Sequence, residues 1–144
     1  MSEFILHPTL EKDTITLGDL ELCRVLLMNE QQFPWVILVP RRTDISELYQ
    51  LDEDEQHQAL RESILVSEIM MQHFDGDKLN TGALGNVVPQ LHLHHIIRFK
   101  NDTVWPKPVW GNFKAKSYTD KEITKLSKLL QHLIKDREPT FSIR

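Results

Sequence analysis

The stretch Asn86-Val87-Val88-Pro89-Gln90-Leu91-His92-Leu93-His94-His95-Ile96-Ile97-Arg98 holds three of the chain's seven histidines within four residues. Apolar residues surround these histidines and no turn former follows Pro89, a pattern typical of a β-strand. Successive side chains of a strand point to opposite faces. Gln90, His92 and His94 are therefore expected to share one face, while His95 points to the other. These three side chains form the candidate catalytic row, and the opposite face of the strand is expected to pack on the core.

Length and composition predict one ordinary globular domain over residues 1–144. Hydrophobic residues make up 40% and charged residues 26% of the chain, values that indicate neither disorder nor a fibrous repeat. The formal net charge is −4, and Arg41-Arg42 is the largest basic cluster. Electrostatics therefore give no support for binding of long nucleic acid, although an anionic small ligand fits a pocket of N–H groups and imidazoles.

The sequence shows neither a secretory signal nor a segment that could span a membrane. No basic region followed by a long apolar run marks the N-terminus, so no secretory signal is expected. The longest apolar block, Trp35 to Val39, is too short to cross a bilayer. Cys23 is the single cysteine and cannot form an internal disulfide. We therefore expect a cytoplasmic protein without membrane contact.

The predicted strands favour an antiparallel arrangement. Thr14–Leu17 and Glu21–Leu27 are β-rich and read as a hairpin turning through Gly18-Asp19. Trp35–Val39 is a strand ended by Pro40, and Lys78–Leu84 is a short strand before the histidine stretch. The order of these strands and of the helices suggests a mostly antiparallel sheet.

Two helices complete the prediction. The first opens at Asp52, with Glu55 as its capping-box partner, and runs to about Phe74. Its buried stripe is expected to contain four residues: Leu60, Ile64, Met71 and Phe74. The second opens at Thr119 and runs to about Lys135. The predicted fold class is α+β, with a mostly antiparallel sheet, one long helix and a C-terminal helix.

Two imidazoles separated by two positions on a strand lie roughly 7 Å apart along the backbone and can converge on one small group. Three interpretations use that arrangement. A neutral imidazole can attack phosphorus or carbon while its neighbour donates a hydrogen bond. Alternatively, both can bind a metal ion, or both can be satisfied by nearby carbonyl groups in a purely structural role.

The segment Gln90-Leu91-His92-Leu93-His94-His95-Ile96, after Gly85-Asn86-Val87-Val88-Pro89, resembles the signature of the histidine triad (HIT) family of nucleotide hydrolases and transferases. Pro34-Trp35-Val36-Ile37-Leu38-Val39-Pro40-Arg41 is similar to another strand of that family, and Asn80-Thr81-Gly82 to its Asn-x-Gly segment. The resemblance covers roughly residues 20 to 111, and its specific part is the His-x-His block.

The resemblance implies a role for each matching residue. His92 would be the nucleophile that takes the α-phosphate of an adenosine dinucleotide polyphosphate or phosphoramidate. His94 would hydrogen-bond the phosphate or the leaving oxygen, and Gln90 would occupy the first triad position. Four residues would bind the nucleotide: Asn29, Asn80, Gly85 and Asn86. The resemblance also implies a HIT-like fold and a homodimer, with no cofactor and no metal.

Three positions depart from the family pattern. Gln90 cannot carry a proton, the upstream histidine of many members falls on Trp35, and Val87 replaces a hydroxyl. General acid–base help is typically worth about 10²- to 10⁴-fold, so we expect a slow but working enzyme. The alternative is a nucleotide-binding module without turnover. A metal-binding protein ranks third, because a third ligand is missing near His92 and His94.

The aromatic segment Trp105-Pro106-Lys107-Pro108-Val109-Trp110 is too broken by proline for a central strand. It could cover a substrate, contact a second subunit or close the edge of the core.

Overall fold

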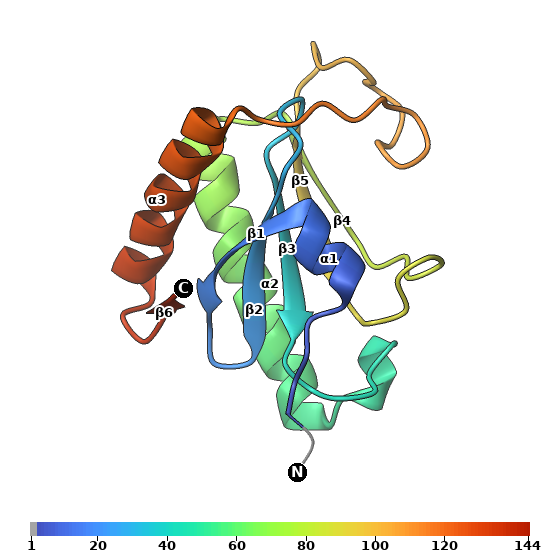
Figure 1. Cartoon of the computed structure of the whole chain (residues 1–144), viewed down its shortest axis with the longest axis vertical. Helices are drawn as coiled ribbons and strands as arrows, with labels where there is room; N and C mark the ends of the chain where they lie inside the picture. The colour runs from blue at the N-terminus through green and yellow to red at the C-terminus, as the bar shows by residue number, and fades with distance from the viewer. Residues whose placement is uncertain (1–2) are drawn as a thin grey trace.

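The computed structural model describes residues 3–144, and its strands form one antiparallel sheet (Figure 1). The sheet order is β4-β5-β3-β2-β1-β6. The strands are β1 (Thr14–Asp19), β2 (Cys23–Met28), β3 (Trp35–Pro40), β4 (Lys78–Gly82), β5 (Leu93–Arg98) and β6 (Ser142–Ile143). The helices are α1 (Pro8–Asp13), the 3-10 turn η1 (Leu48–Gln50), α2 (Glu53–Phe74) and α3 (Asp120–Arg137). This architecture confirms the α+β prediction.

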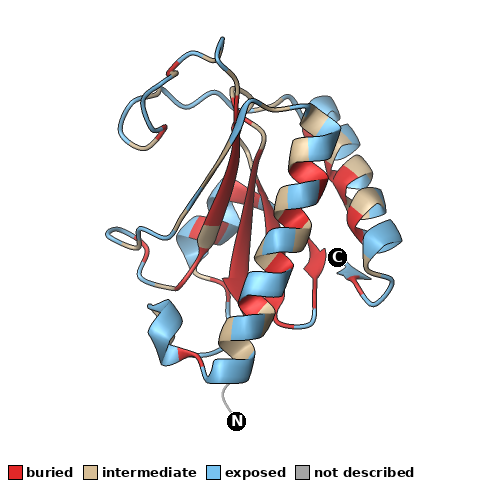
Figure 2. Ribbon diagram, turned by 180° about the vertical axis from the view of Figure 1, so that it is seen from behind, coloured by how far each residue is buried: buried red, intermediate tan, exposed pale blue. Residues whose placement is uncertain are grey.

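The sheet is covered on both faces. Helices α2 and α3 lie on one face, and α1 lies on the other (Figures 1 and 2). One core cluster joins the sheet to α2 and α3, through residues such as Leu38, Ile97 and Val66. A second cluster lies on the α1 face and includes Leu10, Trp35 and Ile96. This two-sided burial explains why β3 is a continuous apolar run, with all of its residues buried.

The hairpin turn lies later than the sequence suggested. Gly18 and Asp19 belong to β1, where they pair with Val25 and Arg24, and the chain turns between Asp19 and Cys23. Glycine allows a close approach between segments here, because a Cβ at Gly18 would clash with the carbonyl oxygen of Ser142. The predicted turn at Gly18-Asp19 is therefore wrong.

Both predicted capping boxes are present. Asp52 caps α2 with Glu55, and Thr119 caps α3 with Glu122, so each helix begins where its side chains satisfy the first free N–H groups. Of the predicted buried stripe of α2, Met71 and Phe74 are partly buried against the core, whereas Leu60 and Ile64 face away from it. Leu60 is 60% and Ile64 49% exposed. The buried residues of α2 are Ala59, Glu62, Val66, Ile69 and Met70.

The histidine strand is shorter than predicted. β5 starts at Leu93, which pairs with Leu38, so continuing the same register would place Leu91 opposite Pro40. Proline has no N–H to donate to a ladder. The N–H of Leu91 instead bonds to the carbonyl of Ile45. His92 therefore lies just before the strand and His94 within it.

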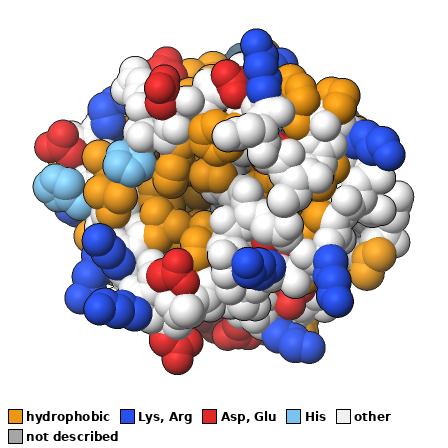
Figure 3. Space-filling view, turned by 90° about the horizontal axis from the view of Figure 1, so that it is seen from above, with side chains coloured by type: hydrophobic (Ala, Val, Ile, Leu, Met, Phe, Trp, Pro, Cys, Tyr) orange, Lys and Arg blue, Asp and Glu red, His pale blue; other side chains and the backbone are white. Residues whose placement is uncertain are grey.

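The end of the molecule that carries the connection from β5 to α3 shows a hollow lined by hydrophobic side chains, with charges of both signs around it (Figure 3). Within the described residues, none of the helices has the length and apolar character that crossing a bilayer requires. The cytoplasmic location stays a prediction from sequence.

Candidate active site

His92 and His94 lie side by side. Their ring centroids are 4.8 Å apart with the planes at 73°, and each residue is only 7% exposed. His95 points to the other face of the sheet, where its Nε2 lies 2.7 Å from Oγ of Ser63 on α2. The alternation expected from the sequence is therefore present, and it separates the His92–His94 pair from the third histidine.

The tautomer of His92 follows from its partner. Its Nδ1 lies 2.7 Å from the backbone carbonyl oxygen of Gln90. A carbonyl oxygen can only accept, so Nδ1 carries the proton of the neutral ring. Nε2 is left with its lone pair, which is the form of imidazole that attacks an electrophile.

His94 has the opposite tautomer. The indole Nε1–H of Trp35 donates to His94 Nδ1 over 2.9 Å. Since Nδ1 accepts, the neutral ring carries its proton on Nε2. Burial, together with the neighbouring His92 and His95, lowers the pKa of His94 to about 3. The pair thus offers one lone pair and one N–H donor, side by side and without a positive charge on His94.

Aromatic side chains cover this pair. The ring of Trp110 lies 5.3 Å from that of His94, and Phe113 packs on Trp35 at 5.8 Å. On β4, Gly82 pairs with His94, and a Cβ at Gly82 would lie 3.4 Å from the Trp110 ring. Trp110, from the segment for which the sequence left three roles open, therefore packs against the ring of His94.

Asn80 lies on the same face as His94, one strand away. It pairs with Ile96 on β5, and its Oδ1 accepts from Nη1 of Arg98 at 3.0 Å. With the oxygen held by Arg98, the amide group of Asn80 keeps its N–H donors for a ligand. The binding role that the family resemblance implies for Asn80 stays a prediction.

Arg98 is buried beside Asn80 and forms an ion pair with Asp102. It is 1% exposed and binds both oxygens of Asp102, at 2.8 and 3.0 Å. Burial alone would raise the pKa of Asp102, but hydrogen bonds from Arg98 and three backbone N–H groups outweigh it and lower the pKa to about 2. Sequence reasoning missed this pair, although the spacing of four residues between Arg98 and Asp102 was a signal.

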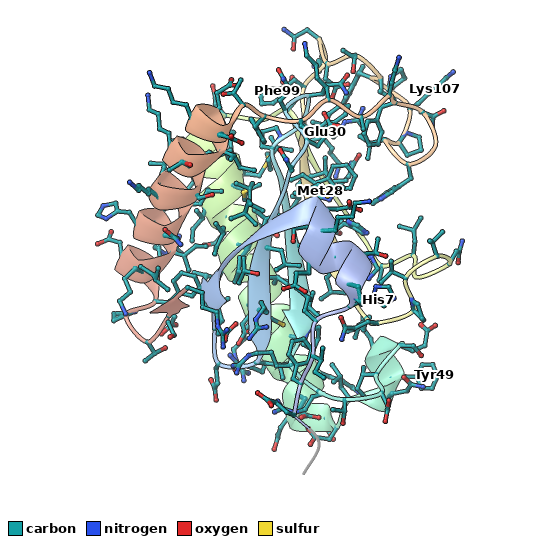
Figure 4. All side chains as sticks on the ribbon, in the orientation of Figure 1. His7, Met28, Glu30, Tyr49, Phe99 and Lys107 are labelled. Carbon is teal, nitrogen blue, oxygen red and sulfur yellow. The ribbon has the colours of Figure 1, made fainter. Side chains whose placement is uncertain are left out.

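Gln90 is engaged elsewhere. Its Oε1 accepts from the N–H of His7 at 2.8 Å, and its Nε2 donates to the carbonyl of Ile5 at 2.9 Å. His7 begins α1, next to the loop that leads into β5 (Figure 4). The side chain of Gln90 therefore holds the N-terminal segment, and only its backbone carbonyl reaches the histidine pair.

The other predicted binding residues are more scattered. Gly85, with φ of 75°, lines a small cavity together with His92, and the exposed Asn86 follows it. Asn29 follows β2 near the opposite end of the sheet, where its Oδ1 accepts from the N–H of Tyr118 at 3.0 Å. The roles of all three stay predictions.

The largest cavity, of about 540 Å³, lies on the α2 face of the sheet. Its lining includes Leu60, Ser63, His94 and His95, and it does not include His92. The largest cavity therefore reaches one member of the histidine pair, His94, while His92 lines the small cavity beside Gly85. Across residues 3–144, no cluster of three or more His, Cys, Asp or Glu side chains is arranged to hold a metal ion.

The chain is similar to proteins of one known family. The HIT domain model matches residues 9–101. A histidine triad protein of Marinobacter aquaeolei is 49% identical, with a TM-score of 0.90 over 94% of this chain and 98% of its own. The histidine triad protein of Bradyrhizobium japonicum is 41% identical, with a TM-score of 0.89 over 92% of this chain and 99% of its own. That of Sinorhizobium meliloti is 40% identical, with a TM-score of 0.85 over 92% of this chain and 96% of its own. No curated protein matches significantly.

Proposed function

Because the chain belongs to the HIT domain family, we propose that it is a nucleotide hydrolase or nucleotidyl transferase acting at the α-phosphate of an adenosine nucleotide. The observation that carries the proposal is the pairing of two opposite tautomers, His92 with a free Nε2 and His94 with an Nε2–H donor. A nucleophile and a hydrogen-bond donor at this spacing suit displacement at phosphorus.

In the proposed reaction, His92 Nε2 attacks the α-phosphorus and the leaving group departs. The product is a phosphohistidine that carries the nucleoside monophosphate. Water then attacks the same phosphorus, the N–P bond breaks, its electron pair returns to Nε2, and a proton passes to solvent. Splitting one displacement into two steps lowers each barrier. Asn80 and the N–H of His94 would hold the phosphate oxygens in both steps.

The test is transfer of the nucleotide to His92. The protein is incubated with dinucleoside polyphosphates and adenosine phosphoramidates, quenched, and analysed by peptide mass spectrometry for an AMP adduct. We expect the adduct on His92 in the wild type and its loss, with loss of AMP release, in His92→Ala. The matched control is His57→Ala, because His57 is exposed on α2. An intact wild type without adduct or AMP release would contradict the proposal.

A second candidate function is nucleotide binding without turnover. It is favoured by the low exposure of His92 and His94 beneath Trp110 and by the engagement of Gln90 with the N-terminal segment. A binding module would be stabilised by AMP, since a ligand that binds the folded state raises the melting temperature. Under this alternative, thermal denaturation shifts upward with AMP while no substrate is consumed.

The family resemblance implies a homodimer, and we also propose that the two copies pair through β4. In the described chain, β4 is an edge strand of the sheet, bonded on one side only, to β5. Leu60 and Ile64 are exposed on the neighbouring helix α2, and Leu60 lines the 540 Å³ cavity. An unpaired strand edge beside exposed apolar side chains is a surface that natural proteins normally cover.

A further inference from the structure

The indole N–H of Trp35 occupies Nδ1 of His94, the atom that would have to accept a second proton if His94 were to act as an acid. We infer that this bond keeps His94 a neutral donor that does not release its proton, so that the site favours substrates whose leaving group departs as an anion. These are phosphoric and acyl anhydrides of a nucleoside monophosphate. Phosphoramidates, whose amine needs a proton to leave, are disfavoured. The inference rests on the proposed function and selects among its substrates.

The geometry around His94 supports the first step. An imidazole gives up a proton and ends neutral only when both nitrogens are protonated beforehand. An indole nitrogen only donates, so protonating His94 Nδ1 would set two N–H groups against each other at 2.9 Å. The same change would place a positive charge in a site that is 7% exposed. The lowered pKa of His94, caused first by burial, agrees with this geometry.

The neighbouring groups do not replace the missing acid. His92 uses its Nε2 for the bond to phosphorus, and its Nδ1–H is bonded to the carbonyl of Gln90. The ring of His95 is on the other face of the sheet, with Ser63. Glu47 lines the same small cavity as His92 but is exposed, and an ionised carboxylate there only accepts. Asn80 donates through an amide, which is not an acid at neutral pH.

The consequence appears in the transfer step. The lone pair of His92 Nε2 forms the N–P bond while the bond from phosphorus to the leaving oxygen breaks. Its electron pair stays on that oxygen, which leaves as a phosphate or carboxylate anion and needs no proton. His94 Nε2–H donates to a phosphate oxygen and keeps its proton throughout. On a phosphoramidate, the same step would have to expel an amine as its anion or take a proton from water.

The size of the discrimination follows from the value of acid catalysis. A positioned general acid typically contributes about 10²- to 10⁴-fold. Without a general acid, the rate of cleavage of an anhydride falls little, whereas the rate for a phosphoramidate falls by most of that factor. We therefore expect kcat/KM for an AMP anhydride to exceed that for an AMP alkylphosphoramidate by at least about 100-fold.

The first experiment measures AMP release by the wild-type protein from two substrates, a dinucleoside polyphosphate and adenosine 5′-phosphoramidate carrying an alkylamine. The expected preference for the anhydride supports the inference. Equal kcat/KM values, with the AMP adduct on His92 present, would overturn it and leave the proposed function standing. If neither substrate gives AMP or an adduct, the proposed function fails and the inference fails with it.

The second experiment tests Trp35 without using activity. Nitrogen-15 NMR of the histidine rings reports which nitrogen carries the proton. In the wild type His94 should show the Nε2–H tautomer, unchanged from pH 8 to pH 5. In Trp35→Phe this signature should change to a mixture of tautomers. Trp110→Phe is the matched control, because the Trp110 ring also packs on His94, at 5.3 Å, and donates no hydrogen bond to it.

The outcomes of the second experiment are equally decisive. A changed His94 signature in Trp35→Phe, with a preserved signature in Trp110→Phe, assigns the tautomer to the indole N–H. A His94 signature identical in the wild type and in a folded Trp35→Phe protein would overturn the role of Trp35. If Trp35→Phe does not fold, the wild-type spectrum decides, since an Nδ1–H or a titrating His94 contradicts the inference.

Discussion

Gln90 makes contacts in two directions, one through its backbone and one through its side chain. Its carbonyl oxygen fixes the tautomer of His92, while its amide bonds to the backbone of Ile5 and His7. A backbone carbonyl does not depend on the side chain, so the tautomer of His92 is protected against substitution at this position. The side chain instead joins the start of the chain to the loop before β5.

For Gln90→Ala we expect a loss of about 1–3 kcal/mol in the free energy of unfolding, because two hydrogen bonds of about 0.5–1.5 kcal/mol each disappear. Urea denaturation measures this loss. Hydrogen exchange should show that the amide of His7 loses protection, since that N–H donates to Gln90 Oε1. Unchanged protection at His7 would contradict the proposed connection.

The segment after β5 depends on one buried ion pair. Arg98 ends the strand, and Asp102 binds its guanidinium and accepts from the N–H groups of Phe99, Val104 and Trp105. These bonds set the direction in which the chain leaves the sheet. That direction carries Trp110 back onto His94. Arg98 also orients Asn80 on β4. The Arg98–Asp102 pair thus positions both Trp110 and the side chain that we propose binds phosphate.

Asp102→Ala should destabilise the protein by about 3–5 kcal/mol, because it leaves the Arg98 charge buried and without its carboxylate. Thermal or urea denaturation measures the change. The matched control is Glu68→Ala, whose ion pair with Arg137 is exposed and should contribute no more than about 1 kcal/mol. Equal effects of the two substitutions would argue against a structural role for the buried pair.

The molecule as a whole places two histidines in a sheet that is buried on both faces. Burial lowers the pKa of His94 to about 3 and that of His95 to about 4. In the unfolded chain both would have the ordinary value of about 6.5. Over the interval between these values, the unfolded state binds more protons than the folded state. Acid therefore favours unfolding through these two side chains.

We expect the free energy of unfolding to be fully maintained above about pH 6.5 and to fall below it, by about 1.4 kcal/mol per pH unit for each histidine. Urea denaturation at pH values from 7 to 5 measures the slope. In His95→Gln the slope should be about half as steep, because only His94 still contributes. A stability that does not change over this interval would contradict the burial of both rings in neutral form.

The edge of the sheet at β4 is the surface through which we propose that two copies form a dimer. Leu60→Lys places a charge on the surface that we propose a second copy covers, and it should halve the mass measured by light scattering. The control is Ile143→Lys, a half-exposed residue on β6 at the other edge of the sheet, which should leave the mass unchanged. A wild-type protein that is monomeric at all concentrations would contradict the dimer.

The sequence by itself determined the elements and the grouping of the histidines. Alternation along the stretch from Gln90 to Arg98 depends only on strand geometry, so it correctly separated His94 from His95. The capping residues Asp52 and Thr119 are local signals, and they correctly marked the starts of α2 and α3. Leu60 and Ile64 on α2 were wrongly predicted as buried, because apolar residues occur all around that helix and only its neighbours select the buried face.

The tertiary structure decided the chemistry of the pair. Trp35 and His94 are 59 positions apart, and the hydrogen bond between them exists only because β3 and β5 pair in one register. Trp110 reaches the same ring because Asp102 turns the chain back across Gly82. Proton positions and solvent exposure are set by such long-range contacts. Residue types and spacing therefore indicate that two histidines meet, and the packed sheet determines which nitrogen of each is free.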